Sequence, residues 1–354
     1  MSEEVVAEVA GKAGRITLNR PRALNALSLA MIRELTATLR AWRDDPGVEV
    51  VTIRGTGKEG PFGAFCAGGD IRFFHAAGLS GDPQLEDFFT EEYTLNHLVH
   101  RYPKPYVAFM DGIVMGGGMG ISQGARCRIV TERTKMAMPE TNIGLFPDVG
   151  GGHFLSRCPG RLGEYLALTG EVIGAADAVD ARLADLVLPS SELPALWERL
   201  SLEGEAAVPT PHRVEGSQLA DHRLEIDRVF ALDTVQDIVR ELEAGPGDWS
   251  RHTAAVLRKR SPLMLHVVLE QVRRARGMNL ADDLRMERDL VHHCFHLRPG
   301  AASETVEGIR ALAVDKDHAP RWNPARIEDV TPEAVAAFFR SPWSPQAHPL
   351  RDLD

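Results

Sequence analysis

An apolar segment that runs into a cluster of glycines constrains the fold more than any other feature of this chain. Residues 106–125 read YVAFMDGIVMGGGMGISQGA and contain six glycines and one carboxylate, Asp111. The length and the glycine spacing of four suit a membrane helix. However, each glycine inside a helix costs about 1 kcal/mol relative to alanine, and a carboxylate at the centre of a membrane costs more. The segment therefore predicts a strand over 106–114 that ends in a glycine turn, with no membrane association.

Short apolar runs alternate with helical runs through the first 190 residues, which predicts an α/β fold. The expected strands cover residues 15–19, 48–54, 126–131 and 135–138, and the expected helices cover 27–42, 86–100, 162–168 and 175–181. Ser28 is a start signal for the first of these helices.

The second part of the chain has a different pattern. Residues 203–222 are rich in glycine and proline, which predicts a linker or surface excursion. Beyond it, helical spacing of apolar residues extends through 229–242, 252–272 and 280–295. We therefore expect three parts: a core over 1–202, the linker over 203–222 and a helical region over 223–354.

Charge and cysteine usage narrow the classes of function and location. Forty basic against fifty acidic residues give a net charge of -10, which disfavours nucleic acid as a partner. The four cysteines form no CxxC pair, which argues against a zinc ribbon and a disulfide framework. The acidic N-terminus lacks the basic and apolar regions of a secretory signal. These features predict a cytoplasmic protein.

Neither a nucleotide-binding glycine motif nor a nucleophile elbow is supported by the surrounding sequence. No GxGxxG or P-loop fits the glycine clusters, which disfavours a nucleotide cofactor. Residues 120–124, GISQG, match the nucleophile elbow of α/β-hydrolases. An elbow serine must stand where a strand meets its helix, and three glycines separate the end of the expected strand from this pentapeptide. We expect Ser122 to lie inside a helix.

His292 and His296 lie one helical turn apart, a spacing that can ligate zinc. No carboxylate follows in the manner of HExxH, and histidines are common on solvated helix faces. We therefore predict no metal site.

Four further segments, in chain order, read ITLNRPRALNAL at 16–27, AFCAGGDI at 64–71, GIVMGGGMG at 112–120 and MPETNIGLFPDVGGG at 138–152. Together they resemble the enoyl-CoA hydratase/isomerase, or crotonase, superfamily, and most of all its 3-hydroxyisobutyryl-CoA hydrolase branch. The resemblance extends from about residue 9 to 339. It implies a crotonase-like spiral of ββα units with a helical C-terminal region, and it leaves a homo-oligomer open.

In this superfamily two backbone N–H groups stabilise the oxyanion of an acyl-CoA thioester, a preorganised arrangement that needs no reorganisation during reaction. By position, the resemblance assigns this oxyanion hole to Gly69 and Gly117. It implies that coenzyme A enters as part of the substrate, with no separate cofactor. The residues that it implies for substrate and CoA binding are Arg22, Ala23, Leu24, Ala67, Asp70, Ile71 and Gly116.

The resemblance also assigns the acids. Glu140 matches the catalytic glutamate, and Asp148 matches a second acid of the hydrolase branch. Gly120 stands where hydratases carry a second catalytic glutamate, and hydration needs both a base and an acid. The residues thus favour hydrolysis of a short-chain 3-hydroxyacyl-CoA, in valine breakdown or a related pathway. Glu140 would be the nucleophile or the general base. A hydratase or isomerase and a non-catalytic acyl-CoA-binding protein are the alternatives.

Overall fold

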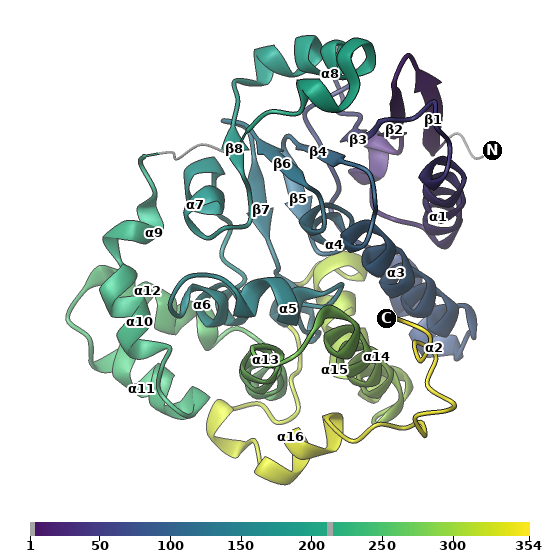
Figure 1. Cartoon of the computed structure of the whole chain (residues 1–354). Helices are drawn as coiled ribbons and strands as arrows, with labels where there is room; N and C mark the ends of the chain where they lie inside the picture. The colour runs from purple at the N-terminus through teal and green to yellow at the C-terminus, as the bar shows by residue number, and fades with distance from the viewer. Residues whose placement is uncertain (1–3, 211–214) are drawn as a thin grey trace. The chain divides into compact units, whose positions relative to one another are not determined.

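The computed structural model describes residues 4–210 and 215–354. By its contacts this part of the chain forms two compact units. The first comprises residues up to Gly69, Glu91–Ala137 and Val172–Asp221. The second comprises Asp70–Thr90, Met138–Glu171 and His222–Asp354. Each unit is therefore built from stretches that are distant in sequence (Figure 1). The expected division into a core over 1–202, a linker over 203–222 and a helical region over 223–354 stays a prediction, and residues 211–214 of that linker lie outside the described residues.

A six-stranded sheet forms the first unit, with strand order β1-β2-β3-β4-β6-β8. Its strands are β1 (Val5–Ala10), β2 (Ala13–Leu18), β3 (Val50–Gly55), β4 (Tyr106–Met110), β6 (Cys127–Val130) and β8 (Leu186–Val187). Only the β1–β2 pair is antiparallel among these, and the other neighbours are parallel. Parallel neighbours joined by crossovers are typical of α/β folds, so the predicted strand and helix alternation is confirmed here.

The helices of the first unit follow the strands along the chain. They are α1 (Leu29–Arg43), α4 (Gly117–Gln123), α7 (Ala175–Asp180), α8 (Leu193–Glu203) and α9 (Gln218–Asp221), with the short helices η1 (Pro21–Ala23), η3 (Ser190–Glu192) and η4 (Gly204–Ala207). Helix α3 (Gln84–His100) belongs to this unit from Glu91 onward. As expected, Ser28 caps α1: its side chain accepts a hydrogen bond from the Met31 N–H.

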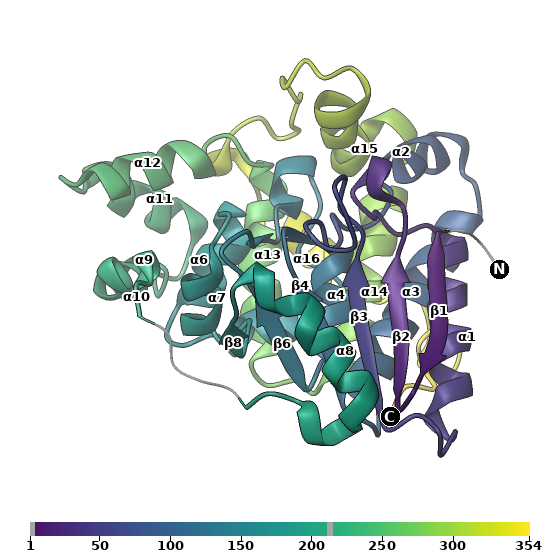
Figure 2. The ribbon, with the colours of Figure 1, turned by 90° about the horizontal axis from the view of Figure 1, so that it is seen from above.

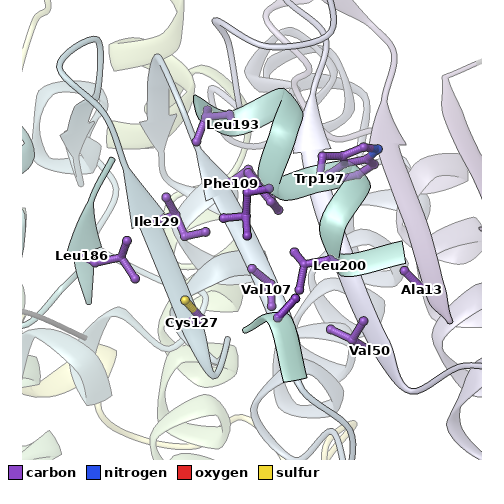
Figure 3. Close-up of a cluster of buried hydrophobic side chains, with 12 residues drawn as sticks. Ala13, Val50, Val107, Phe109, Cys127, Ile129, Leu186, Leu193, Trp197 and Leu200 are labelled. Atoms are coloured by element: carbon purple, nitrogen blue, oxygen red, sulfur yellow. The ribbon is translucent and has the colours of Figure 1, made fainter. Parts of the chain in front are cut away.

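Helix α8 lies across one face of the sheet (Figure 2). Its apolar side chains, Leu193, Trp197 and Leu200, meet side chains from the strands in a buried cluster. Figure 3 shows Val107 and Phe109 of β4 pointing into this cluster. The cluster fixes one face of the central strands, since burial of apolar surface stabilises by about 25 cal/mol per Å².

The predicted single strand over 106–114 is wrong in one respect, because it is broken at Asp111 and Gly112. Gly112 has a φ of +81°, which ends β4 and starts β5 (Ile113–Met115) in a separate two-stranded sheet with β7 (Lys135–Ala137). The buried Asp111 carboxylate accepts a hydrogen bond from Thr131 Oγ1 at 2.5 Å. The turn therefore places a satisfied carboxylate between two strands, which apolar spacing alone cannot reveal.

The second unit is helical in its C-terminal part, as the sequence predicts. Its helices are α2 (Ile71–Ser80), α5 (Gly151–Ser156), α6 (Leu162–Thr169), α10 (Arg223–Val229), α11 (Val235–Ala244), α12 (Asp248–Leu257), α13 (Pro262–Ala275), α14 (Leu280–His296), α15 (Glu304–Ile309) and α16 (Pro332–Phe338). Shorter helical turns are η2 (Glu140–Ile143), η5 (Gly300–Ala302), η6 (Arg310–Val314) and η7 (Ile327–Asp329).

The helix expected over 252–272 is two helices, α12 and α13. Pro262 starts α13, and the Ser261 side chain caps it by accepting a hydrogen bond from the Met264 N–H at 3.3 Å. Proline suits the first turn of a helix and disrupts its interior. Across the described residues, no helix combines the length and apolarity that crossing a membrane requires.

Candidate active site

The segment that ends at Gly69 is held between two neighbours in the first unit. The Leu27 N–H donates to the Gly68 carbonyl at 2.8 Å, and the Met115 N–H donates to the Cys66 carbonyl at 3.0 Å. Gly68 has a φ of +105°, a conformation that favours glycine. The Cys66 thiol lies in this segment, but burial raises its pKa to about 12. A thiol with such a pKa is a poor nucleophile, so Cys66 is not a candidate nucleophile.

Gly69 and Gly117, the residues predicted for the oxyanion hole, are neighbours in the structure. Gly117 is the first residue of α4, so its N–H has no acceptor within the helix. A Cβ atom added to Gly117 would lie 3.4 Å from the Gly69 nitrogen. Over the described ranges, neither N–H donates a hydrogen bond to another part of the protein. Two adjacent free N–H groups can bind one anionic oxygen.

Several residues predicted to bind CoA lie in the loop over residues 20–27, here called the Arg22 loop. This loop is hydrogen-bonded to the segment that ends at Gly69. Arg22 and Ala23 form the end of η1, and Leu24 follows it in the left-handed region with a φ of 51°. The Leu24 carbonyl accepts a hydrogen bond from the Ala67 N–H at 3.0 Å. Arg22 is exposed. The structure thus brings Arg22, Ala23, Leu24 and Ala67 together, and Gly116 precedes Gly117 as the N-cap of α4.

The remaining two residues of that set, Asp70 and Ile71, begin the second unit. The Asp70 carboxylate caps α2, accepting hydrogen bonds from the N–H groups of Arg72 and Phe73. Ile71 is the first residue of α2. This cap gives Asp70 a structural role that sequence reasoning did not assign.

Sequence reasoning missed Asn25, which organises the Arg22 loop. Its buried side chain donates to the carbonyls of Ala64 at 2.9 Å and Phe65 at 3.1 Å, and it accepts from the Arg20 N–H at 2.8 Å. Asn25 has a φ of 56°, a conformation that asparagine tolerates better than most residues. Its position between the apolar residues Leu24 and Ala26 could have indicated that Asn25 is buried.

The two predicted acids lie in the second unit. Glu140 starts η2 and Asp148 lies in the loop before α5, and each is 6% exposed. Within the described residues, Oε2 of Glu140 has no hydrogen-bond partner. Burial, and then the charge of Asp148, raise the pKa of Glu140 well above its usual range. The fold therefore couples the two acids electrostatically, and a strongly shifted buried carboxyl of this kind is a candidate functional group.

A pair of buried carboxyls on α14 holds the Asp148 loop. Glu287 accepts hydrogen bonds from the N–H groups of Gly150 at 2.7 Å and Gly152 at 2.9 Å, and Asp283 accepts from His153 N–H at 2.8 Å. Burial raises the pKa of Asp283 to about 7 and that of Glu287 above its usual range. Both are positioning residues that sequence reasoning missed. Their signal was two acids four residues apart on the apolar face of a predicted helix.

The structure also places the two motifs that the sequence analysis rejected, the GISQG pentapeptide and the His292–His296 pair. Ser122 lies inside α4 as predicted, where its buried hydroxyl donates to the Gly118 carbonyl at 2.8 Å. His292 and His296 are joined by a carboxylate that the sequence pattern did not reveal, Glu86.

The Glu86, His292 and His296 ligand atoms lie within 4.8 Å of one another, so these residues could hold a metal ion. The same carboxylate also pairs with the Arg288 guanidinium. Burial raises the pKa of Glu86, but the hydrogen bond from His292 and the charge of Arg288 outweigh it, and the net shift is downward. Because a second cation next to Arg288 would be repelled, we interpret the group as an ion-paired cluster.

These features, taken with sequence comparison, define the class of protein. The chain belongs to the enoyl-CoA hydratase/isomerase family, whose model matches residues 13–339. It is 39% identical to the mitochondrial 3-hydroxyisobutyryl-CoA hydrolase of Gallus gallus, over 95% of this chain and 89% of that protein. It is likewise 39% identical to a probable 3-hydroxyisobutyryl-CoA hydrolase of Arabidopsis thaliana, over 95% of this chain and 91% of that protein.

Solved structures confirm the predicted crotonase-like α/β fold with its helical C-terminal region. An enoyl-CoA hydratase from Rhodobacter sphaeroides aligns with a TM-score of 0.90 and 41% identity, over 98% of this chain and 99% of that one. A carnitinyl-CoA dehydratase from Mycobacterium thermoresistibile aligns with a TM-score of 0.90 and 39% identity, over 97% and 98% of the two chains.

The predicted cytoplasmic location is wrong by this comparison, because the vertebrate relatives, including those of Gallus gallus and Rattus norvegicus, are named mitochondrial. The four cysteines are all free and buried. Free thiols argue against an oxidising compartment, but they do not distinguish one reducing compartment from another. Cysteine usage therefore could not separate the cytoplasm from the mitochondrial location of the relatives.

Proposed function

We propose that this protein hydrolyses a short-chain 3-hydroxyacyl-CoA thioester of the 3-hydroxyisobutyryl-CoA type. The observation that carries the proposal is the coupled pair of buried acids, Glu140 and Asp148, in a chain with glycine at position 120. A hydratase needs a base and an acid to add water across a double bond, and Gly120 supplies neither. The naming of relatives as 3-hydroxyisobutyryl-CoA hydrolases supports the same reaction.

In the proposed reaction the thioester carbonyl oxygen binds to the N–H groups of Gly69 and Gly117. These groups stabilise the negative charge that develops on that oxygen. Glu140 then either attacks the carbonyl carbon, giving a mixed anhydride that water opens, or removes a proton from an attacking water. In both versions the C–S bond breaks and CoA leaves as the thiolate. Asp148 would orient the water or the 3-hydroxyl group.

Hydration of an enoyl-CoA is the second candidate, because two similar solved structures are described as a hydratase and a dehydratase. The two candidates differ in the bond that changes. Hydration removes the conjugated double bond and leaves the thioester intact, whereas hydrolysis releases a free thiol.

One assay separates the two reactions. We expect rapid thiol release from 3-hydroxyisobutyryl-CoA or 3-hydroxypropionyl-CoA, with the absorbance of conjugated crotonyl-CoA unchanged on the same sample. The lack of one general acid typically costs about 10²- to 10⁴-fold in rate, which makes hydration the minor activity. Loss of conjugation without thiol release would assign the protein to the hydratases. A failure to turn over any acyl-CoA, with binding retained, would identify a non-catalytic acyl-CoA-binding protein.

The pH dependence tests the coupling of the two acids. Glu140 acts in its ionised form, so kcat/KM should rise with pH through its raised pKa. Asp148 contributes to this raised value by its charge. Asp148→Asn should therefore move the rising limb of the pH profile to lower pH, while burial keeps it above the ordinary value for glutamate. An unmoved limb would show that Glu140 is not the titrating group or that Asp148 is not ionised beside it.

A further inference from the structure

The turn η2, which begins at Glu140, is held on one side by the two residues that precede α13. The Ser261 N–H donates a hydrogen bond to the Thr141 carbonyl at 3.1 Å. The Arg260 guanidinium donates to Oδ1 of Asn142 at 2.8 Å. Within the described residues, Oε2 of Glu140 itself has no hydrogen-bond partner. The backbone of η2 therefore largely determines the position of this carboxyl.

Helix α15 contacts the other end of η2. Oγ1 of the fully buried Thr305 donates to the Gly144 carbonyl at 2.7 Å. A Cβ atom added to Gly308 would lie 2.4 Å from the Ile143 carbonyl oxygen. A Cβ atom added to Gly144 would lie 2.4 Å from the Glu304 carbonyl oxygen. Because both contacts join backbone to backbone, η2 has no room to move toward α15.

Hydrogen bonds inside the turn connect this contact to the candidate catalytic residue. The Glu140 carbonyl accepts hydrogen bonds from the Gly144 N–H and, at 3.0 Å, from the Leu145 N–H. The Thr305 hydroxyl binds the carbonyl of the same Gly144. A displacement of Gly144 would therefore displace the backbone of Glu140.

Glu304, the first residue of α15, joins the two sides of this support. Its carboxylate accepts hydrogen bonds from the Ser261 hydroxyl at 2.5 Å and from the Asn323 N–H at 2.6 Å. Glu304 is 7% exposed. Burial raises its pKa, and these two hydrogen bonds oppose the shift. The carboxylate thus fixes Ser261, the residue whose N–H binds Thr141 in η2.

We propose that Glu304 and Thr305 are positioning residues, which hold η2 so that the Glu140 carboxyl stays where it acts on the thioester. The proposal rests on the proposed function, because it takes Glu140 as the group that acts in hydrolysis. Neither residue is required to touch the substrate. Their effect on the reaction passes through Ser261 and Gly144, the two groups that they bind.

The test compares variants of the whole protein. Thr305→Val removes the hydroxyl and keeps the shape of the side chain, whereas Thr305→Ser keeps the hydroxyl. Glu304→Gln replaces the carboxylate that accepts from Ser261, and it is the second variant if Thr305→Val does not fold. Glu225→Gln is the matched control, because Glu225 accepts a hydrogen bond from the Ser250 hydroxyl at 2.6 Å. This pair joins α10 to α12 in the same unit.

We expect Thr305→Val and Glu304→Gln to lower kcat for thiol release by about 10-fold or more, since a misplacement of about 1 Å can cost about 10²-fold. The KM for 3-hydroxyisobutyryl-CoA should change by less than about twofold, because the loss falls on the reacting geometry and spares substrate binding. Thr305→Ser should retain most of the wild-type kcat. Glu225→Gln should lower the melting temperature and leave kcat of the folded fraction unchanged.

The titration of Glu140 gives a second readout, which needs no substrate. The NMR signal of its isotope-labelled carboxyl is identified by its loss in Glu140→Gln. Burial and the charge of Asp148 raise the pKa of Glu140, and the charged side chains bound at other sides of η2 are Arg260 and Glu304. Thr305→Val changes no charge. Once η2 can move, water reaches the carboxyl, so in this variant the pKa should fall toward its ordinary value. In Thr305→Ser it should stay raised.

Two outcomes would overturn the proposal. Wild-type kcat in the folded fraction of Thr305→Val, with an unmoved pKa of Glu140, would make α15 a structural support only. An equal loss of kcat in Glu225→Gln would attribute the effect to general destabilisation. Failure of the proposed function is distinguishable from both. The wild-type protein would then release no thiol, yet the pKa of Glu140 would still fall in Thr305→Val, and the positioning of Glu140 by α15 would stand.

Discussion

Replacing Glu140 with glutamine is expected to lower kcat for thiol release by about 10²- to 10⁴-fold, the usual cost of losing an acid–base group. The amide keeps the shape of the side chain but neither attacks a thioester well nor accepts a proton. The fold should be unaffected or stabilised, since Glu140 is buried and its Oε2 has no partner within the described residues. Thiol release at saturating 3-hydroxyisobutyryl-CoA, together with thermal unfolding, measures both effects.

Glu164 provides the matched control, because it is a buried glutamate of the same unit with an opposite environment. It forms ion pairs with Arg161 and Arg276, each at 2.7 Å. Glu164→Gln should lower the melting temperature, since it leaves two half-buried guanidinium groups without their carboxylate partner, and it should preserve kcat in the folded fraction. A Glu140→Gln enzyme with wild-type kcat would exclude Glu140 from catalysis.

Substituting Gly117 with alanine should also have a large effect, a loss of about 10²- to 10³-fold in kcat, comparable to the loss of one oxyanion-hole donor. The added Cβ would lie 2.5 Å from Oε1 of Glu92 and 3.4 Å from the Gly69 nitrogen. The flexible Glu92 side chain can move away, so the protein should fold, but the space beside the N–H pair is then filled. Steady-state kinetics and circular dichroism on the purified variant test this expectation.

Alanine substitutions at two other glycines are controls for Gly117→Ala, one expected to be harmless and one expected to impair folding. A Cβ on Gly174 would have no atom within 4 Å, so Gly174→Ala should behave as wild type. A Cβ on Gly118 would lie 2.4 Å from the Cys66 carbonyl oxygen, a backbone atom that cannot move cheaply, so Gly118→Ala should impair folding. Full activity of Gly117→Ala would show that no substrate atom occupies the space next to Gly117.

Local signals in the sequence predicted most of the fold. The start of α1 at Ser28 and the place of Ser122 inside α4 were both predicted correctly. Each prediction used only residues close by in the sequence, a capping side chain in one case and the glycines before Ser122 in the other. The break at Gly112 was not predicted, since β4 and β5 are both apolar and their separation depends on pairing with different strands. The break before Pro262 could have been predicted, because proline disrupts a helix interior.

For the candidate site, the sequence predicted the residues that lie within compact motifs and missed those that support them. Gly69, Gly117, Glu140 and Asp148 each stand in a short recognisable segment. Glu287 contacts Gly150 across 137 residues. The spacing of Asp283 and Glu287 on an apolar helix face could have marked them as buried acids, although an acid on a helix is usually solvated. No local pattern identifies the distant backbone groups that they bind. Glu92 was missed for the same reason, although its Oε1 would lie 2.5 Å from a Cβ atom on Gly117.

The long separation between Gly150 and Glu287 also bears on how the protein is made. A ribosome releases the Asp148 loop well before it synthesises α14, so the backbone N–H groups of Gly150 and Gly152 must wait for the carboxylate that they bind in the folded protein. A nascent chain that stops short of residue 280 would contain both catalytic candidates and yet lack the support that fixes one of them. The Asp148 loop is thus completed only after α14 has been made.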